Sequence, residues 1–206
     1  MGRQDAGMNL DHAVAQRRTL IVEGCDGVRR EELLTGLADR HGYTVTRASA
    51  DLPHVDPVRP YREILQHSGV LAVDAGLVGE LVYGPLRRGH SRVSWIQAYD
   101  FAEAVAERDG AFVHVTAPVT VLEDRLAARG ASAADLAEIG AAVTGYDHAF
   151  STLAQHAPVL TVDDEPLTGP GPDPRPGEAD PAPPVASYAR RLPRVRSPVP
   201  CRAPHL

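Results

Sequence analysis

The chain of 206 residues is long enough for one domain with a buried core and too short for two domains of ordinary size. Its 43% hydrophobic and 23% charged residues are typical of a soluble globular protein. The net charge of −6 and the absence of any apolar run near the roughly 18 residues that span a bilayer argue against general nucleic-acid binding and against a membrane partner.

The first residues and the cysteines indicate a cytoplasmic protein. Residues 1–17 carry Asp5 and Asp11 and lack the continuous apolar stretch of a secretory signal, so we expect them to form a flexible leader. Cys25 and Cys201 have the spacing of neither a metal site nor a disulfide framework. All 21 basic residues are arginine, which excludes catalysis through a lysine.

Short β-branched runs alternate with longer amphipathic runs between residues 18 and 165, which we expect to form the folded domain. Strands are predicted at 19–23, 43–47, 70–74, 111–116 and 159–162. Helices are predicted at 29–41, 60–67, 94–108, 119–129 and 133–156. This alternation predicts an α/β fold with a five-stranded parallel sheet covered by helices on both faces, where ligands bind beyond the carboxyl ends of the strands.

Residues 166–206 have a different composition, because they hold twelve of the eighteen prolines and almost no hydrophobic periodicity. Such a segment buries too little apolar surface to offset its chain entropy, and we expect a disordered Pro/Arg-rich tail. No acidic residue follows Asp180, and the basic residues beyond it are Arg190, Arg191, Arg194, Arg196 and Arg202. A solvated tail and a short arm that binds an acidic partner both fit this pattern.

The segment after the first strand stands where a phosphate-binding loop would lie. A P-loop reads G-x-x-x-x-G-K-[ST], because its glycines let backbone N–H groups converge on phosphate oxygens, its lysine neutralises them and its hydroxyl holds Mg²⁺. Gly24 supplies the first glycine, whereas Arg29, Arg30 and Glu31 occupy the other three positions. A phosphate cradle and a tight turn whose glycines are steric necessities both remain open.

Several motifs resemble those of thymidylate kinases and related P-loop nucleotide kinases. Residues 20–27, L-I-V-E-G-C-D-G, are similar to the opening F-x-x-F-E-G-x-D-G of that family. Residues 71–89 resemble its D-R segment followed by S-E-x-V-Y-G, and residues 113–130 resemble its fourth strand and R-x-x-x-R-G lid. The motifs keep the family's order over residues 18–165, which implies a P-loop NTPase-type three-layer sandwich.

The resemblance implies roles for individual residues. ATP phosphates would be held by the loop residues Gly24, Asp26, Gly27, Arg29 and Arg30. Catalytic roles fall to Arg30, Asp74, Arg125 and Arg129, and Asp74 would also lie near Mg²⁺. A deoxynucleoside monophosphate would be bound by Glu80, Tyr83, Arg87 and Arg88. The residues themselves leave other roles open: packing for Tyr83, a solvated turn for Arg87 and Arg88, and surface ion pairs for Arg125 and Arg129.

The departures from the family pattern weaken the expected chemistry. The P-loop lysine and hydroxyl are absent, and Ala75 stands where the family has the arginine that clamps the monophosphate. Phosphoryl transfer depends on positioning and charge compensation, so ATP binding and turnover should both suffer. Two functions therefore remain open: a nucleotide kinase of weakened or altered activity that uses ATP and Mg²⁺, and an inactive relative that binds a nucleotide or a protein. A homodimer is compatible with either.

Overall fold

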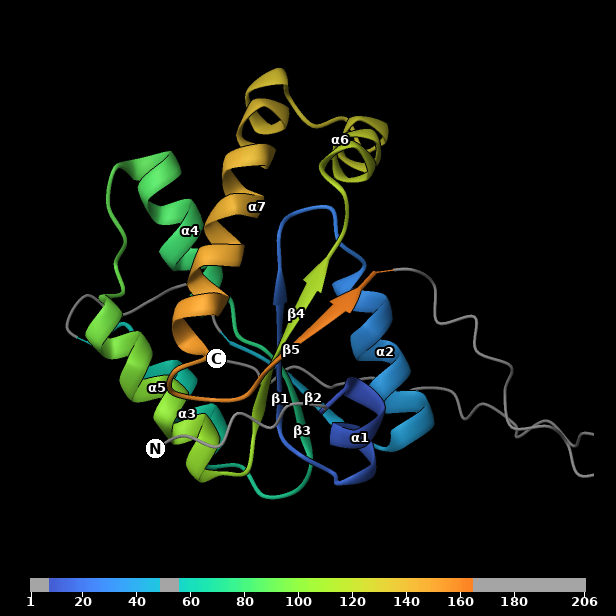
Figure 1. The fold of residues 1–206 in the computed structure, drawn as a ribbon, viewed down its shortest axis with the longest axis vertical. Coiled ribbons are helices and arrows are strands. Elements are labelled where there is room, and N and C mark those ends of the chain that lie inside the picture. Colours follow the sequence, from blue (N-terminus) through green and yellow to red (C-terminus); the bar gives the residue numbers. More distant parts are fainter. Residues whose placement is uncertain (1–7, 49–55, 165–206) are drawn as a thin grey trace, which may run out of the picture. The chain divides into compact units, whose positions relative to one another are not determined.

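The computed structural model describes residues 8–48 and 56–164 (Figure 1). Its helices are α1 (Leu10–Ala15), α2 (Arg30–His41), α3 (Arg59–Leu65), α4 (Leu77–Arg88), α5 (Trp95–Glu107), α6 (Val119–Ala128) and α7 (Ala133–Leu153). Its strands are β1 (Leu20–Gly24), β2 (Thr44–Arg47), β3 (Leu71–Asp74), β4 (Ala111–Thr116) and β5 (Val159–Asp163). The chain divides into units 1–167 and 168–206, and the tail predicted at 166–206 lies outside the described residues.

The five strands form one parallel sheet in the order β2-β3-β1-β4-β5, which confirms the predicted α/β class. The central strand β1 pairs with β3 on one side and β4 on the other, so that Ile21 lies opposite Val73 and Phe112. Both faces of a parallel sheet are covered by helices, which is why Ile21 and its neighbours Leu20 and Val22 are fully buried.

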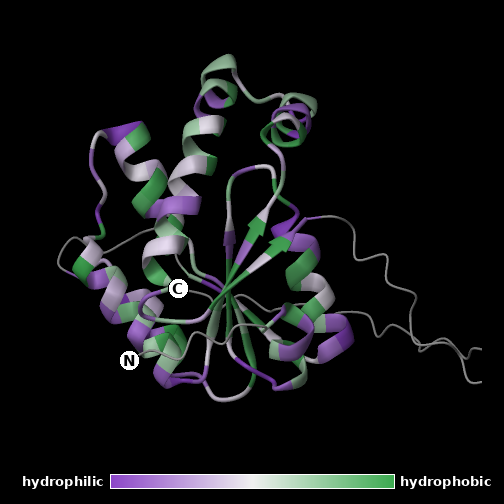
Figure 2. Ribbon diagram, viewed as in Figure 1, coloured by the Kyte–Doolittle hydropathy of each residue, from purple (hydrophilic) through white to green (hydrophobic). Residues whose placement is uncertain are grey.

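The helices cover the sheet from two sides. Figure 1 shows α1 and α2 on one side and α3, α5 and α7 on the other. Hydrophobic residues concentrate on the strands, while the hydrophilic ones gather on the outer helix surfaces (Figure 2). None of the helices in the described part of the chain combines the length and the apolar character needed to cross a membrane.

Two helices were not among the predicted elements. Helix α1 lies inside the predicted flexible leader; the side chain of Asn9 caps it by accepting the His12 N–H, and Ala13 is fully buried. That expectation is therefore wrong for residues 10–15. Helix α4 contains two glycines and Pro85, which lower helix propensity, yet its buried face packs on α7 and β1. Tertiary packing overrides propensity here.

Candidate functional site

Two glycines shape the loop between β1 and α2. A Cβ at Gly24 would lie 2.4 Å from the carbonyl oxygen of Val115 on β4, so no larger residue fits without moving the sheet. Gly27 has a φ of +94°, which L side chains rarely adopt. Steric requirements alone therefore explain these two glycines. Whether the loop also binds a phosphate has to be judged from its contacts with the rest of the protein.

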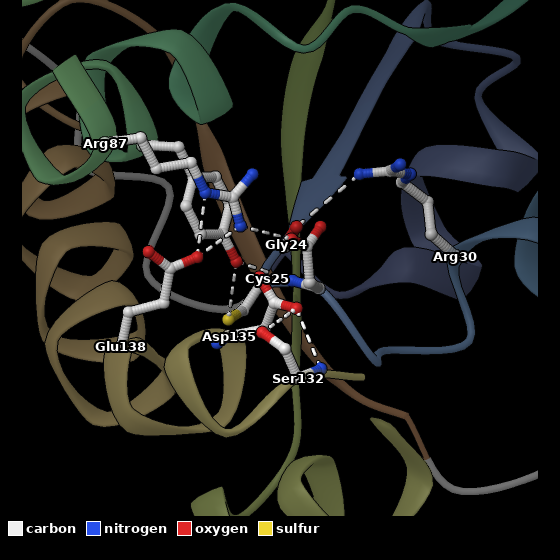
Figure 3. A network of polar contacts seen from close by, with 9 residues as sticks. Gly24, Cys25, Arg30, Arg87, Ser132, Asp135 and Glu138 are labelled. Carbon is white, nitrogen blue, oxygen red and sulfur yellow. Dashed lines mark hydrogen bonds and ion pairs between the residues drawn. The ribbon is translucent and has the colours of Figure 1, made fainter. Parts of the chain in front are cut away.

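Tyr83 of α4 holds one side of the loop. Its hydroxyl accepts a hydrogen bond from the Asp26 N–H at 2.9 Å and lies 3.2 Å from Cys25 Sγ. Burial raises the pKa of the Cys25 thiol and of Tyr83, so both groups stay protonated at neutral pH. The guanidinium of Arg87 stacks 4.1 Å from the centre of the Tyr83 ring and bonds to Asp26. It also bonds to Glu138 of α7 (Figure 3).

Arg30, which stands at the lysine position of a P-loop, pairs with Asp74 at the end of β3. Its Nε lies 3.3 Å from Asp74 Oδ1, and its Nη1 donates to the carbonyl of Gly24 at 3.5 Å. Arg47 also approaches Asp74, at 4.0 Å, and forms an ion pair with Glu31. Burial raises the pKa of Asp74, and the charge of Arg30 partly offsets this effect. The predicted donor-phosphate cation and the predicted metal ligand therefore neutralise each other.

Asp164, which directly follows β5, binds the other side of the loop. Its Oδ2 accepts a hydrogen bond from the backbone N–H of Arg29 at 2.9 Å and forms an ion pair with Arg125 of α6. Arg125 also donates to the carbonyl of Gly27 at 3.3 Å. Arg125 thus contacts the loop, whereas Arg129 is exposed at the C-terminal cap of α6, and the catalytic role assigned to both stays a prediction.

Glu80, in the first turn of α4, pairs with Arg88, in its last turn. The Glu80 carboxylate also accepts the N–H of Arg92 at 2.8 Å and the Arg92 guanidinium at 2.9 Å. Burial acts to raise the pKa of Glu80, but the bonds from Arg92 and Arg88 outweigh it and leave that pKa lowered. These contacts stabilise the turn after α4, and the substrate role assigned to Glu80 and Arg88 stays a prediction.

Glu23 was not among the predicted site residues, although a carboxylate within an apolar strand is a usable signal. It is fully buried, and its two oxygens accept the N–H groups of Leu77 at 3.0 Å, Val78 at 3.2 Å and Gly79 at 3.0 Å. Burial raises its pKa to about 7, although the backbone donors act in the opposite direction. Glu23 therefore fixes the start of α4 over the carboxyl end of β1.

A cavity of about 270 Å³ lies beside the loop. It is lined by Cys25, Val28, His114, Val115, Thr116, Ala117, Leu122, Val143, Tyr146 and Asp147. The imidazole of His114 stacks on Phe150 with ring centres 4.3 Å apart, and burial lowers the pKa of His114, which keeps it neutral. The cavity combines apolar walls, aromatic rings and a few polar groups, the usual lining of a small-molecule site.

The donor set does not fit a resident Mg²⁺ ion. Asp74 is flanked by Arg30 and Arg47, whose positive charges oppose a divalent cation. Glu31, at the position of the metal-binding hydroxyl, is exposed and paired with Arg47. Among residues 8–48 and 56–164 no three His, Cys, Asp or Glu side chains gather in a metal-binding group.

The sequence matches no protein-family model and no curated protein. Its structure is similar to the crystal structure of the YorR protein from Bacillus subtilis in complex with phosphorylated GDP, with 17% identity, coverage of 71% of this chain and 85% of that chain, and a TM-score of 0.62. A deoxyadenosine kinase from M. mycoides with bound dCTP matches with 12% identity, coverage of 71% and 90%, and a TM-score of 0.45. The first likeness shows the fold alone: this chain shares its α/β architecture with YorR.

Proposed function

We propose that this protein binds a nucleotide at the carboxyl edge of its sheet and does not transfer phosphate at the rate of an active kinase. The observation that carries the proposal is the state of Arg30. Its charge is paired with Asp74, yet its buried Nε makes no hydrogen bond within the described residues. The Arg30 side chain is 29% exposed and contacts the loop, so the rest of its guanidinium is open to a phosphate oxygen of a ligand.

The reduced rate follows from charge compensation. An active site for phosphoryl transfer places free positive charge where the transferred group develops negative charge. Arg30 shares its charge with Asp74, and the planar guanidinium does not have the shape of an ammonium group. Removing one such stabilising group costs about two or more decades in rate.

The nucleoside part of the ligand would lie in the cavity of about 270 Å³ beside the loop. Cys25 and Val28 belong both to the loop and to the cavity wall, so one molecule can reach the two places. The aromatic side chains of His114 and Tyr146 offer faces and edges for a planar base. YorR, which has a similar fold, was crystallised with phosphorylated GDP, and this agrees with a nucleotide as the ligand class.

Weak kinase activity on a deoxynucleoside monophosphate, with ATP and Mg²⁺, is the second candidate. It is favoured by the contact of Arg30 Nη1 with the Gly24 carbonyl, which keeps the cation beside the loop where a P-loop lysine would lie. Arg125 on the other side of the loop adds a second cation. Turnover would then be slow, for the reasons given above.

Calorimetric titration of the full chain with ATP, GDP and dTMP, each with and without Mg²⁺, tests nucleotide binding. We expect at least one nucleotide to bind and Mg²⁺ not to strengthen the binding, because Asp74 is neutralised by arginines. Val143→Phe narrows the cavity and should weaken binding, while Thr144→Phe, exposed on the same helix, should not. If no nucleotide binds the wild type, the proposal is wrong.

A further inference from the structure

The contact between Asp164 and the loop places a carboxylate at the amino end of a long helix. The acceptor of the Arg29 N–H, the N-terminal cap position of α2, is Asp164 Oδ2. The same oxygen receives the guanidinium of Arg125 from α6. The Asp164 side chain is only 4% exposed, so the carboxylate is enclosed by these donors.

Three features of this contact favour a negative group. The helix dipole is positive at the start of α2, the Arg29 N–H has no partner within its own helix, and Arg125 is cationic. A phosphate oxygen has the charge and the acceptor geometry that the Asp164 carboxylate has. The chain itself therefore supplies the anion at this position.

We propose that Asp164 is an internal latch: its carboxylate closes the loop and has to leave before a phosphate group binds to the Arg29 N–H and Arg125. The proposal rests on the proposed function for the identity of the ligand, but not for the contact itself. A ligand must displace a charge-assisted hydrogen bond and an ion pair, which lowers its apparent affinity. Opening also frees Arg125 to bind the incoming anion.

The neighbouring residue offers a matched control. Asp163 is exposed, and its carboxylate accepts a hydrogen bond from the Thr116 hydroxyl at 3.1 Å on the last strand pair of the sheet. Asp164→Asn and Asp164→Ser remove the latch charge, whereas Asp163→Asn removes the same charge one residue earlier. Net charge changes equally in Asp164→Asn and Asp163→Asn, so any difference between them reports the contact.

Inorganic pyrophosphate is the probe, titrated into the full chain and followed by calorimetry. We expect both Asp164 variants to bind it at least fivefold more tightly than the wild type and Asp163→Asn. A merely structural role for Asp164 would lower stability without raising this affinity. A smaller gain, or no binding of pyrophosphate to any of the four proteins, overturns the latch.

If the Asp164 variants do not fold, NMR of the wild-type protein with and without pyrophosphate tests the latch instead. Saturating pyrophosphate should shift the Asp164 carboxyl carbon and the Arg29 amide and leave the Asp163 carboxyl carbon in place; an unmoved Asp164 signal overturns the proposal. The two proposals fail separately. Pyrophosphate binding that improves in Asp164→Asn without any nucleotide binding supports the latch and contradicts the proposed function. Nucleotide binding to the wild type without tighter pyrophosphate binding in Asp164→Asn supports the proposed function and contradicts the latch.

Discussion

Replacing Glu23 with glutamine should remove a large part of the pH dependence of stability. Burial raises the pKa of Glu23 from 4.5 to about 7 in the folded protein. Between these two values the folded state binds more protons than the unfolded state, so the free energy of unfolding falls as the pH rises. The interval from 4.5 to about 7, at about 1.4 kcal/mol per pH unit, amounts to about 3 kcal/mol. This stability is present below pH 4.5 and lost by about pH 7.

Urea unfolding of the wild type and of Glu23→Gln between pH 4 and 8 measures the effect. The difference in unfolding free energy between the two should shrink by about 3 kcal/mol across this range. The subtraction cancels other titrations, including that of His114, whose lowered pKa acts in the opposite direction. Glu107→Gln, exposed on α5, should keep the wild-type pH dependence. A constant difference between wild type and Glu23→Gln would refute the raised pKa.

Three further perturbations test the architecture around the site. Gly24→Ala should destabilise the protein by about 3 kcal/mol or more in urea unfolding, because its Cβ would meet the Val115 carbonyl at 2.4 Å, whereas Gly140→Ala, in open space on α7, should stabilise it by about 1 kcal/mol. Equal effects would contradict the steric reading. Tyr83→Phe removes the acceptor of the Asp26 N–H and should cost about 1 to 3 kcal/mol by the same method; no loss would mean that the loop is held otherwise. Deleting residues 166–206 should leave the circular dichroism spectrum and the melting temperature nearly unchanged, and a loss of several kcal/mol would contradict the predicted domain boundary.

The strands and most helices could be predicted because their signals are local. β-branched runs and amphipathic periods mark β1 to β5 to within one or two residues. The loop after β1 was found for the same reason, since glycines and a strand-to-helix change stand next to each other in the sequence.

The partners within the site could not be predicted, because they are distant in sequence. The resemblance implied a substrate role for Arg87, but nothing in the sequence indicated its bond to Glu138, 51 residues away. Asp164 meets the Arg29 N–H across 135 residues, and no local pattern marks it. Glu23 stands out in the sequence as an acidic residue in a buried strand. Its hydrogen-bond donors lie on α4, a helix that was not predicted because its glycines and Pro85 lower helix propensity.

The most direct test of the central claim is the turnover of the wild-type chain with ATP, Mg²⁺ and each deoxynucleoside monophosphate. The triple variant Arg29→Gly, Arg30→Lys, Glu31→Thr serves as the comparison, because it restores the P-loop pattern and should raise turnover by orders of magnitude. Active kinases work at about 1 to 100 s⁻¹. With Arg30 neutralised by Asp74 and no hydroxyl for Mg²⁺, we expect the wild type to fall below about 10⁻² s⁻¹. Wild-type turnover of about 1 s⁻¹ or faster would contradict the account.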